Sequence, residues 1–249
     1  MSGSMKTTAY QYILQKMTRG ELEPGMQISE LSIAAELGIS RSPVRDALSQ
    51  MVTEGMVERV PRFGTVIKKL STRELSDLYG LRVALEGYAA ELVAENVSDA
   101  DLREMEEACE GIRSISMDLK RSQAKQMTPE MLAEMSRLDM KFHLVILKAT
   151  RNRMLLKSAH DTRQMVRIFG IRRVENFDYD YINGVYQYHR GIFEAIRDRD
   201  PQKARQLMTE HINFSRDGAL KFISEHQQQQ HKDDFDQMAE SLILASQET

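Results

Sequence analysis

Four side chains in the second half of the chain have the types and spacing of a metal site. Asp139 and His143, in LDMKFH, are four positions apart and project from one face of a helix. His189 and His211 lie 22 residues apart, in segments with the periodicity of two successive helices. Three imidazoles and one carboxylate suit Zn²⁺ or another divalent transition metal such as Ni²⁺ or Mn²⁺.

The spacing alone leaves simpler interpretations open. An Asp and a His four positions apart on a helix are commonly a hydrogen-bonded surface pair, and His189 and His211 taken alone fit core or surface histidines. The other three histidines are expected not to be ligands: His160, His226 and His231. Most of the 16 methionines are expected to fill the core.

Basic side chains gather near the N-terminus. Residues 1–75 carry ten Lys or Arg against eight Asp or Glu, a net charge of +2, in a chain whose net charge is −3. Residues 41–73 hold seven basic and three acidic side chains. The overall negative charge argues weakly against nucleic-acid binding, but this stretch is where contacts with DNA phosphates are expected.

Two arginines in this stretch are well placed to read DNA. Arg41 and Arg45 are four positions apart and emerge from one helix face, and an arginine donates two hydrogen bonds to guanine or grips phosphate. Ser42 and the helix N-terminus offer phosphate donors, and Arg62 and Gly64 stand at the tip of a predicted wing. Taken alone, two arginines on a helix also fit a solvated surface face.

The N-terminal periodicity predicts a winged helix-turn-helix. The first two predicted helices cover about 7–19 and 30–37, and the third lies within 39–55, where Ser40 or Ser42 can cap it. The predicted strands cover 56–60 and 65–68. Ser29 is a plausible N-cap of the second helix, and Gly38 ends it. The strands are joined by a turn that begins at Pro61, so we expect a two-stranded wing.

Helical periodicity dominates the rest of the chain. Ser71 or Thr72 is the predicted cap of the first of these helices, with Glu74 as its capping-box partner. About six helices are predicted, at 71–98, 99–120, 128–149, 152–173, 179–198 and 201–225. The tail is expected to be a fraying helix end or a linker, with one last amphipathic turn or two at 235–244. The fold class is therefore all-α with a small β wing: a winged helix-turn-helix domain at 1–70, a C-terminal antiparallel helical bundle at 71–228 and a polar tail at 229–249.

The N-terminal motif resembles the GntR family of transcriptional regulators. The similarity covers the run LSIAAELGISRSPVRDALSQMVTEGMVERVPRFGTVI, with SRSPVRDAL, EGMV and a P-x-x-G wing in the family's order and spacing. The resemblance implies that Arg41 and Arg45 read or grip the operator and that Gly64 is the wing-tip glycine. Some members carry a further DNA-contacting arginine where this chain has Leu31, so operator sequence does not transfer.

The C-terminal region, residues 75–225, resembles the FCD effector domain of the FadR-like branch of that family. The branch's pattern is D-x-x-x-H, then H-x-x-I-x-x-A-I, then a final H, and this chain fills every position with Asp139, His143, His189 and His211. The resemblance implies that these four residues hold the metal. It also matches Arg82, in LRVALEGYAA, to an arginine that faces the effector pocket, whereas a surface pair of Arg82 with Glu86 is the alternative.

The resemblance and the residues together predict a regulator and not an enzyme. We expect a homodimer that binds an inverted-repeat operator in double-stranded DNA, under the control of a small carboxylate-bearing metabolite. A metal-sensing regulator and a metalloenzyme fused to a DNA-binding domain remain alternatives. The single cysteine, Cys109, is expected to be a buried thiol. With no apolar leader or membrane-length segment, the chain is expected to be cytoplasmic.

Overall fold

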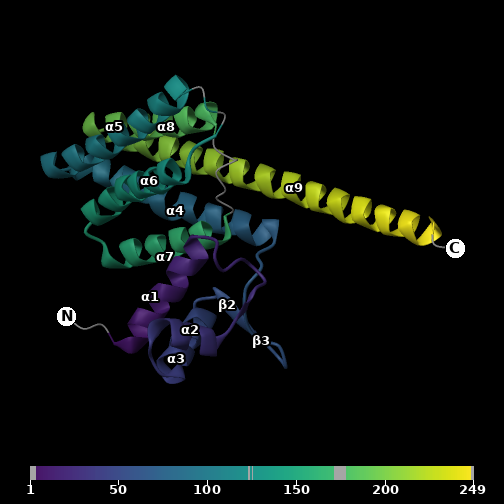
Figure 1. Ribbon diagram of the computed structural model, residues 1–249. Coiled ribbons are helices and arrows are strands. Elements are labelled where there is room, and N and C mark those ends of the chain that lie inside the picture. Colours follow the sequence, from purple (N-terminus) through teal and green to yellow (C-terminus); the bar gives the residue numbers. More distant parts are fainter. Residues whose placement is uncertain (1–3, 123, 125, 171–177, 248–249) are drawn as a thin grey trace. The chain divides into compact units, whose positions relative to one another are not determined.

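The computed structural model describes residues 4–122, 124, 126–170 and 178–247, and it divides the chain into two compact units. One unit comprises Met1–Leu75 and Gln164–Gly170, and the other comprises Ser76–Arg163 and Ile171–Thr249. The first is a helix-turn-helix with a small sheet and the second is helical (Figure 1). The predicted fold class, all-α with a small β wing, is confirmed.

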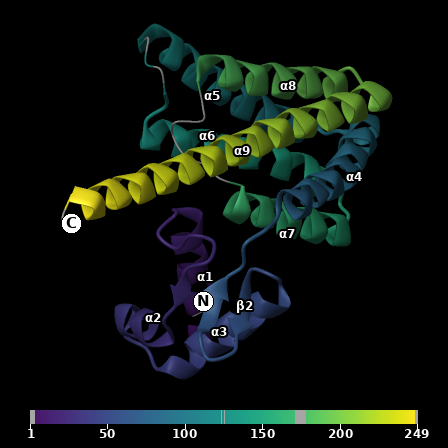
Figure 2. The same ribbon diagram turned by 90° about the vertical axis from the view of Figure 1, so that its right-hand side faces the viewer.

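Three helices and three short strands form the N-terminal part of the first unit (Figure 2). The helices are α1 (Met5–Thr18), α2 (Glu30–Leu37) and α3 (Arg41–Thr53), and the strands are β1 (Gln27–Ile28), β2 (Val57–Val60) and β3 (Gly64–Ile67). Helix α3 packs against α1 and α2. Its buried stripe consists of Val44, Ala47, Leu48 and Met51. This stripe fixes which face of α3 is turned outward.

The turn between α2 and α3 follows from two local signals. The Ser29 side chain accepts a hydrogen bond from the Ser32 amide at 3.2 Å, which caps the start of α2 as predicted. Gly38 ends α2 with φ of 64°, a left-handed conformation in which a glycine avoids the steric cost of a Cβ. The chain then reverses over two residues and α3 begins at Arg41.

The two predicted strands of the wing are present as β2 and β3, but β1 joins them in a three-stranded sheet, so the predicted number of strands is wrong. The strands are antiparallel in the order β1-β3-β2, with Gln27 opposite Val66 and Val60 opposite Gly64. Strand β1 is two residues long, too short to show the alternation by which a strand is recognised in a sequence.

In the described part of the chain, six helices follow the wing. They are α4 (Thr72–Asn96), α5 (Asp99–Ser122), α6 (Pro129–Ala149), α7 (Arg153–Phe169), α8 (Tyr179–Arg197) and α9 (Pro201–Gln247). They belong to the second unit except for the first residues of α4 and the end of α7. Ser71 and Glu74 form the predicted capping box at the start of α4. Helix α5 packs against α6 and α8, and α8 packs against α9. Cys109 is fully buried in α5, as predicted.

Two predicted helix ends differ from the structure. Helix α7 ends at Phe169, and the last three residues of the predicted helix 152–173 lie outside the described residues. Helix α9 runs on to Gln247, so the prediction that it ends near residue 225 and gives way to a frayed tail or linker is wrong. The sequence after Gly218 contains no further glycine or proline, and its glutamines, lysines and leucines favour helix. Within the described residues, no helix combines the length and apolarity needed to cross a membrane.

Candidate functional site

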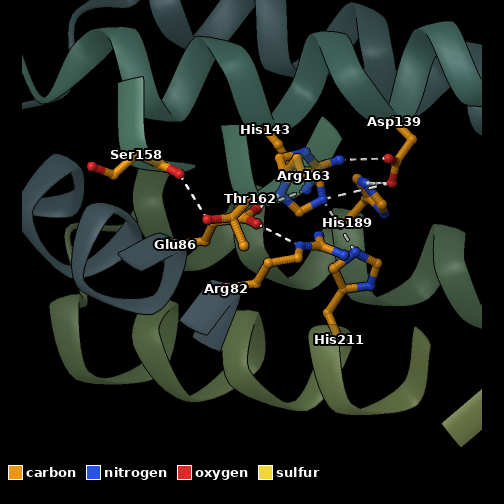
Figure 3. A network of polar contacts seen from close by, with 9 residues as sticks. All are labelled: Arg82, Glu86, Asp139, His143, Ser158, Thr162, Arg163, His189 and His211. Carbon is orange, nitrogen blue, oxygen red and sulfur yellow. Dashed lines mark hydrogen bonds and ion pairs between the residues drawn. The ribbon is translucent and has the colours of Figure 1, made fainter. Parts of the chain in front are cut away.

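The helical unit brings together the four side chains singled out in the sequence. Asp139 and His143 come from α6, His189 from α8 and His211 from α9. One ligand atom from each lies within 4.8 Å of every other. The three imidazoles are at most 1% exposed. The alternative interpretation of these residues as surface groups is therefore wrong for this cluster, which is shown in Figure 3.

The distances between the ligand atoms suit a bound metal ion. His143 Nε2 lies 3.2 Å from His211 Nε2, and Asp139 Oδ1 lies 3.6 Å from His143 Nε2. The same Asp139 oxygen lies 3.5 Å from His189 Nε2. Four ligands bound tetrahedrally at the usual zinc distances are about 3.3 Å apart. These three distances are close to that spacing, and all four donors lie within 4.8 Å of one another.

Neighbouring groups fix which ring nitrogens face the cluster. His189 Nδ1 donates to the Val185 carbonyl at 2.8 Å, which leaves the lone pair on its buried Nε2 directed at the cluster. His143 Nδ1 lies 2.6 Å from Glu86 Oε2, so its proton faces that carboxylate and its Nε2 lone pair also faces inward. Nitrogen lone pairs directed at one another are unfavourable without a proton or a cation between them. The donor set therefore fits a divalent metal ion.

The electrostatic environment favours the metal-binding protonation states of Asp139, His189 and His211. Burial lowers the pKa of His189, with a partial offset from Asp139, and burial together with the other two imidazoles holds the pKa of His211 well below its usual value. Burial opposes ionisation of Asp139, but the Arg163 charge and the neighbouring imidazoles outweigh it and hold the pKa of the carboxyl well below its usual range. Neutral imidazoles and an ionised carboxylate are the forms that bind metals.

A second layer of buried charges surrounds the cluster. Glu86, on α4, is 1% exposed. Its Oε1 accepts from Arg82 Nε at 2.7 Å, and its Oε2 accepts from Arg163 Nη1 at 2.8 Å as well as facing His143. Arg163 also donates through Nη2 to Asp139 Oδ2 at 2.7 Å. Arg163 thus links Asp139, a candidate metal ligand, to the Glu86 carboxylate.

Sequence reasoning missed two members of this layer. Arg163 lies on α7, where the sequence offered only a helical pattern, and it meets Glu86 across 77 positions of chain. Glu86 was considered only as a partner for Arg82 on the protein surface. The pair exists, but both side chains are buried, at 7% and 1% exposure, so the surface interpretation is wrong. The one signal available was the spacing of four positions between them.

The first unit places the predicted DNA-contacting residues at the surface. The Arg41 and Arg45 side chains are 58% and 56% exposed, and Ser42 is exposed beside them in the first turn of α3. Both guanidinium groups contact Glu30 Oε2, at 3.3 Å for Arg41 Nη2 and 3.2 Å for Arg45 Nη2. Glu30, the first residue of α2, was not singled out in the sequence, because the contact crosses the turn between the two helices.

The wing tip is shaped by an unusual backbone. Arg62 is exposed and adopts a positive φ of 65°, and Gly64 follows with φ of 103°. The Gln27 side-chain amide donates to the Phe63 carbonyl, and it lies 3.0 Å from the place that a Cβ on Gly64 would occupy. Phe63 itself is 54% exposed. A side chain at Gly64 would meet both backbone strain and the Gln27 side chain.

Together, an exposed basic helix in a winged helix-turn-helix and a helical unit with a buried histidine cluster define a DNA-binding transcriptional regulator. The pattern of the FCD domain family matches residues 77–214, and that of the bacterial regulatory proteins of the gntR family matches residues 5–67. The chain belongs to the GntR family of bacterial regulators and carries an FCD domain. The resemblance found in the sequence is thereby confirmed.

Individual relatives agree with this assignment. The chain is 25% identical to the HTH-type transcriptional regulator YdhC of Bacillus subtilis, over 82% of this chain and 86% of the relative. It is 26% identical to the Nta operon transcriptional regulator of Aminobacter aminovorans, over 80% and 87% of the two chains. The solved structure of Escherichia coli McbR/YncC has a similar fold, with a TM-score of 0.68 at 19% identity and coverage of 92% of this chain and 99% of that one.

Proposed function

We propose that this regulator binds an inverted-repeat operator as a homodimer and that a small carboxylate-bearing metabolite, held at a metal ion in the helical unit, controls its affinity for DNA. Residues 1–70 would bind the operator, and residues 71–228 would bind the effector and form the dimer. The observation that carries the proposal is the convergence of three buried imidazoles and one carboxylate, with ligand atoms within 4.8 Å of one another. Regulation is favoured over catalysis because the relatives are described as transcriptional regulators.

The metal would be held by Asp139, His143, His189 and His211. Zn²⁺ suits this mixture of imidazole and carboxylate, and Ni²⁺ or Mn²⁺ are further candidates. A bound ion would supply a positive centre able to accept a carboxylate oxygen of the effector. The protein's own part is to fix the ring orientations, through the Val185 carbonyl for one histidine and the Glu86 carboxylate for another.

The charges around the cluster favour an anionic effector. In and beside the cluster, the positive charges of the buried Arg82 and Arg163 balance the negative charges of the buried Glu86 and the partly buried Asp139. With neutral histidines, a divalent cation leaves two positive charges uncompensated in a site of low polarity. A monocarboxylate would balance one of these charges, and a dicarboxylate would balance both. Arg82, which Figure 3 shows beside His211, is the candidate to pair with it.

The DNA part of the proposal rests on the exposed first turn of α3. Arg41, Ser42 and Arg45 would enter the major groove, and Arg62 and Gly64 would bring the wing to the backbone or the minor groove. Two copies related by a two-fold axis would read the two half-sites of an inverted repeat.

Arg45→Ala tests the recognition helix. We expect operator binding to weaken by about 1–3 kcal/mol if Arg45 makes a bidentate contact with a base. The measurement is fluorescence anisotropy with the duplex that the wild-type protein selects most strongly from a random library. Arg113→Ala is the matched control, because Arg113 lies on α5 and pairs at the surface with Glu110. If Arg45→Ala and Arg113→Ala bind the operator equally well, Arg45 does not contact the bases.

A thermal-shift screen tests the effector. We expect at least one member of a panel of small mono-, di- and tricarboxylates to raise the melting temperature of the zinc-loaded protein and to leave the chelator-treated protein unchanged, because a ligand of the native state stabilises it. Selected acids are then added to the DNA-binding assay. A shift of equal size with and without zinc would contradict a metal-held carboxylate.

A metal-sensing regulator is the second candidate. It is favoured by the number of protein ligands, since four are enough to complete a tetrahedral shell with no place for an effector. This candidate predicts operator affinity that follows zinc concentration with no organic acid present. A response that needs both zinc and a carboxylate supports the first proposal.

A further inference from the structure

The surface of the helix-turn-helix contains one carboxylate directly between the two arginines of α3. Glu30 Oε2 lies 3.3 Å from Arg41 Nη2, and it lies 3.4 Å from Arg45 Nε and 3.2 Å from Arg45 Nη2. A single oxygen is therefore shared by both guanidinium groups. The Glu30 side chain is 23% exposed, less than half the exposure of either arginine.

Glu30 is ionised in this arrangement. Burial opposes ionisation, but the hydrogen bonds from Arg45 and Arg41 outweigh it, and the pKa of the Glu30 carboxyl lies below its usual value. The first turn of α3 and the start of α2 thus present two positive charges and one negative charge to a DNA duplex. A carboxylate close to DNA repels phosphates, so it weakens the part of the attraction that does not depend on sequence.

The same contact fixes the orientation of the arginines. An arginine has five N–H donors, and Arg45 turns its Nε and one Nη2 donor toward Glu30. Three donors, at the Nη1 and Nη2 end, remain for a partner on the other side. That end-on pair of nitrogens is suited to the O6 and N7 acceptors of guanine. A long exposed side chain held in this way loses less freedom when it binds.

We propose that Glu30 is a positioning residue that makes DNA binding selective. It holds the Arg41 and Arg45 guanidinium groups in place for base edges and cancels part of their attraction to phosphates. Directional hydrogen bonds to the correct bases are kept, whereas binding to unrelated sequence is weakened. This inference rests on the proposed role of the two arginines in operator binding.

Two variants of the full-length protein distinguish the effect of the Glu30 charge from its effect on the positions of the arginines. Glu30→Gln removes the charge at nearly constant size, and Glu30→Asp keeps the charge on a side chain one methylene shorter. The matched control is Glu21→Gln, which removes the same charge from the same unit at a residue whose ion pairs with Lys16 and Arg19 are long, at 3.9 and 3.8 Å. Circular dichroism verifies that each variant is folded.

The assay compares two duplexes at several salt concentrations between about 50 and 200 mM. One is the duplex that the wild-type protein selects most strongly from a random library, and the other is a shuffled duplex of the same composition. For Glu30→Gln we expect affinity for the shuffled duplex to rise at least about threefold and the salt slope to steepen by about one. The ratio of selected to shuffled affinity should fall at least about fivefold. For Glu30→Asp the ratio should fall with an unchanged salt slope, because the charge is retained.

Each contrary result has a distinct meaning. If Glu30→Gln behaves as Glu21→Gln does, the inference is wrong. If Glu30→Asp keeps the wild-type ratio, the positioning role is wrong. Arg45→Ala on the same two duplexes tests the proposed function separately: should it bind both as the wild type does, the role of the arginines fails. Should it lose affinity while Glu30→Gln matches its control, only the role of Glu30 fails.

Discussion

Zinc is expected to raise the melting temperature of the wild-type protein by about 10 °C and that of the His211→Ala variant by less than about 3 °C. A ligand of the native state at a thousand times its dissociation constant stabilises by about 4 kcal/mol, which for a chain of this size is about 8–16 °C. His211 supplies one of four ligand atoms, and its Nε2 lies 3.2 Å from that of His143. Without it the shell is open and the affinity for zinc falls steeply.

The comparison must be made within each variant, with zinc and with a chelator. His211 is 1% exposed, and its replacement leaves a cavity that lowers stability whether or not a metal binds. The readout is therefore the zinc-dependent difference in melting temperature, and zinc affinity by titration calorimetry is a second measure. His160→Ala is the matched control, because His160 is an exposed histidine on α7. A full zinc-dependent shift in His211→Ala would contradict the metal site.

Glu86→Ala is expected to destabilise the metal-free protein by about 3–5 kcal/mol, because it removes the carboxylate that Arg82 and Arg163 share in the protein interior, although Arg163 keeps its hydrogen bond to Asp139. Glu86 pairs with Arg82 and Arg163, which are only 6% and 5% exposed. The same change removes the carboxylate that lies 2.6 Å from His143 Nδ1. Loss of such an orienting group weakens metal binding about 10- to 100-fold.

Denaturant unfolding of the chelator-treated protein measures the first effect, and zinc titration measures the second. Glu134→Ala is the matched control: Glu134 lies on α6 and pairs with Arg137 at the surface, where an ion pair contributes little. Glu86 has two roles, to balance the charges of the arginines and to orient His143. Glu86→Gln removes the charge but keeps a carbonyl oxygen that can accept a hydrogen bond from one arginine. Wild-type stability in Glu86→Ala would mean that the two guanidinium groups find other partners.

Local sequence signals predicted the helix-turn-helix well. Ser29 caps α2, Gly38 ends it in the left-handed conformation, and the apolar stripe of α3 is buried as its spacing indicates. These features depend on a few neighbouring residues, so they are visible in a short stretch of sequence. Strand β1 was not predicted, because its two residues form a strand only through pairing with β3, almost 40 positions later in the chain.

The candidate metal cluster was predictable by comparison with a family pattern, and the residues around it were not. Asp139 and His143 occupy one helix face, but nothing in the spacing of His189 and His211 requires them to meet the other two. Glu86 and Arg163 illustrate the limit more sharply. An ion pair between α4 and α7 has no local signature, because it depends on how whole helices pack.

Cys109 makes opening of the helical unit measurable by thiol labelling. The thiol is fully buried in α5, and burial raises its pKa to about 12. A thiol reagent attacks the thiolate, so modification requires that this helix first leave the core. Because the sequence contains a single cysteine, one labelling event per molecule reports one opening of the helical unit.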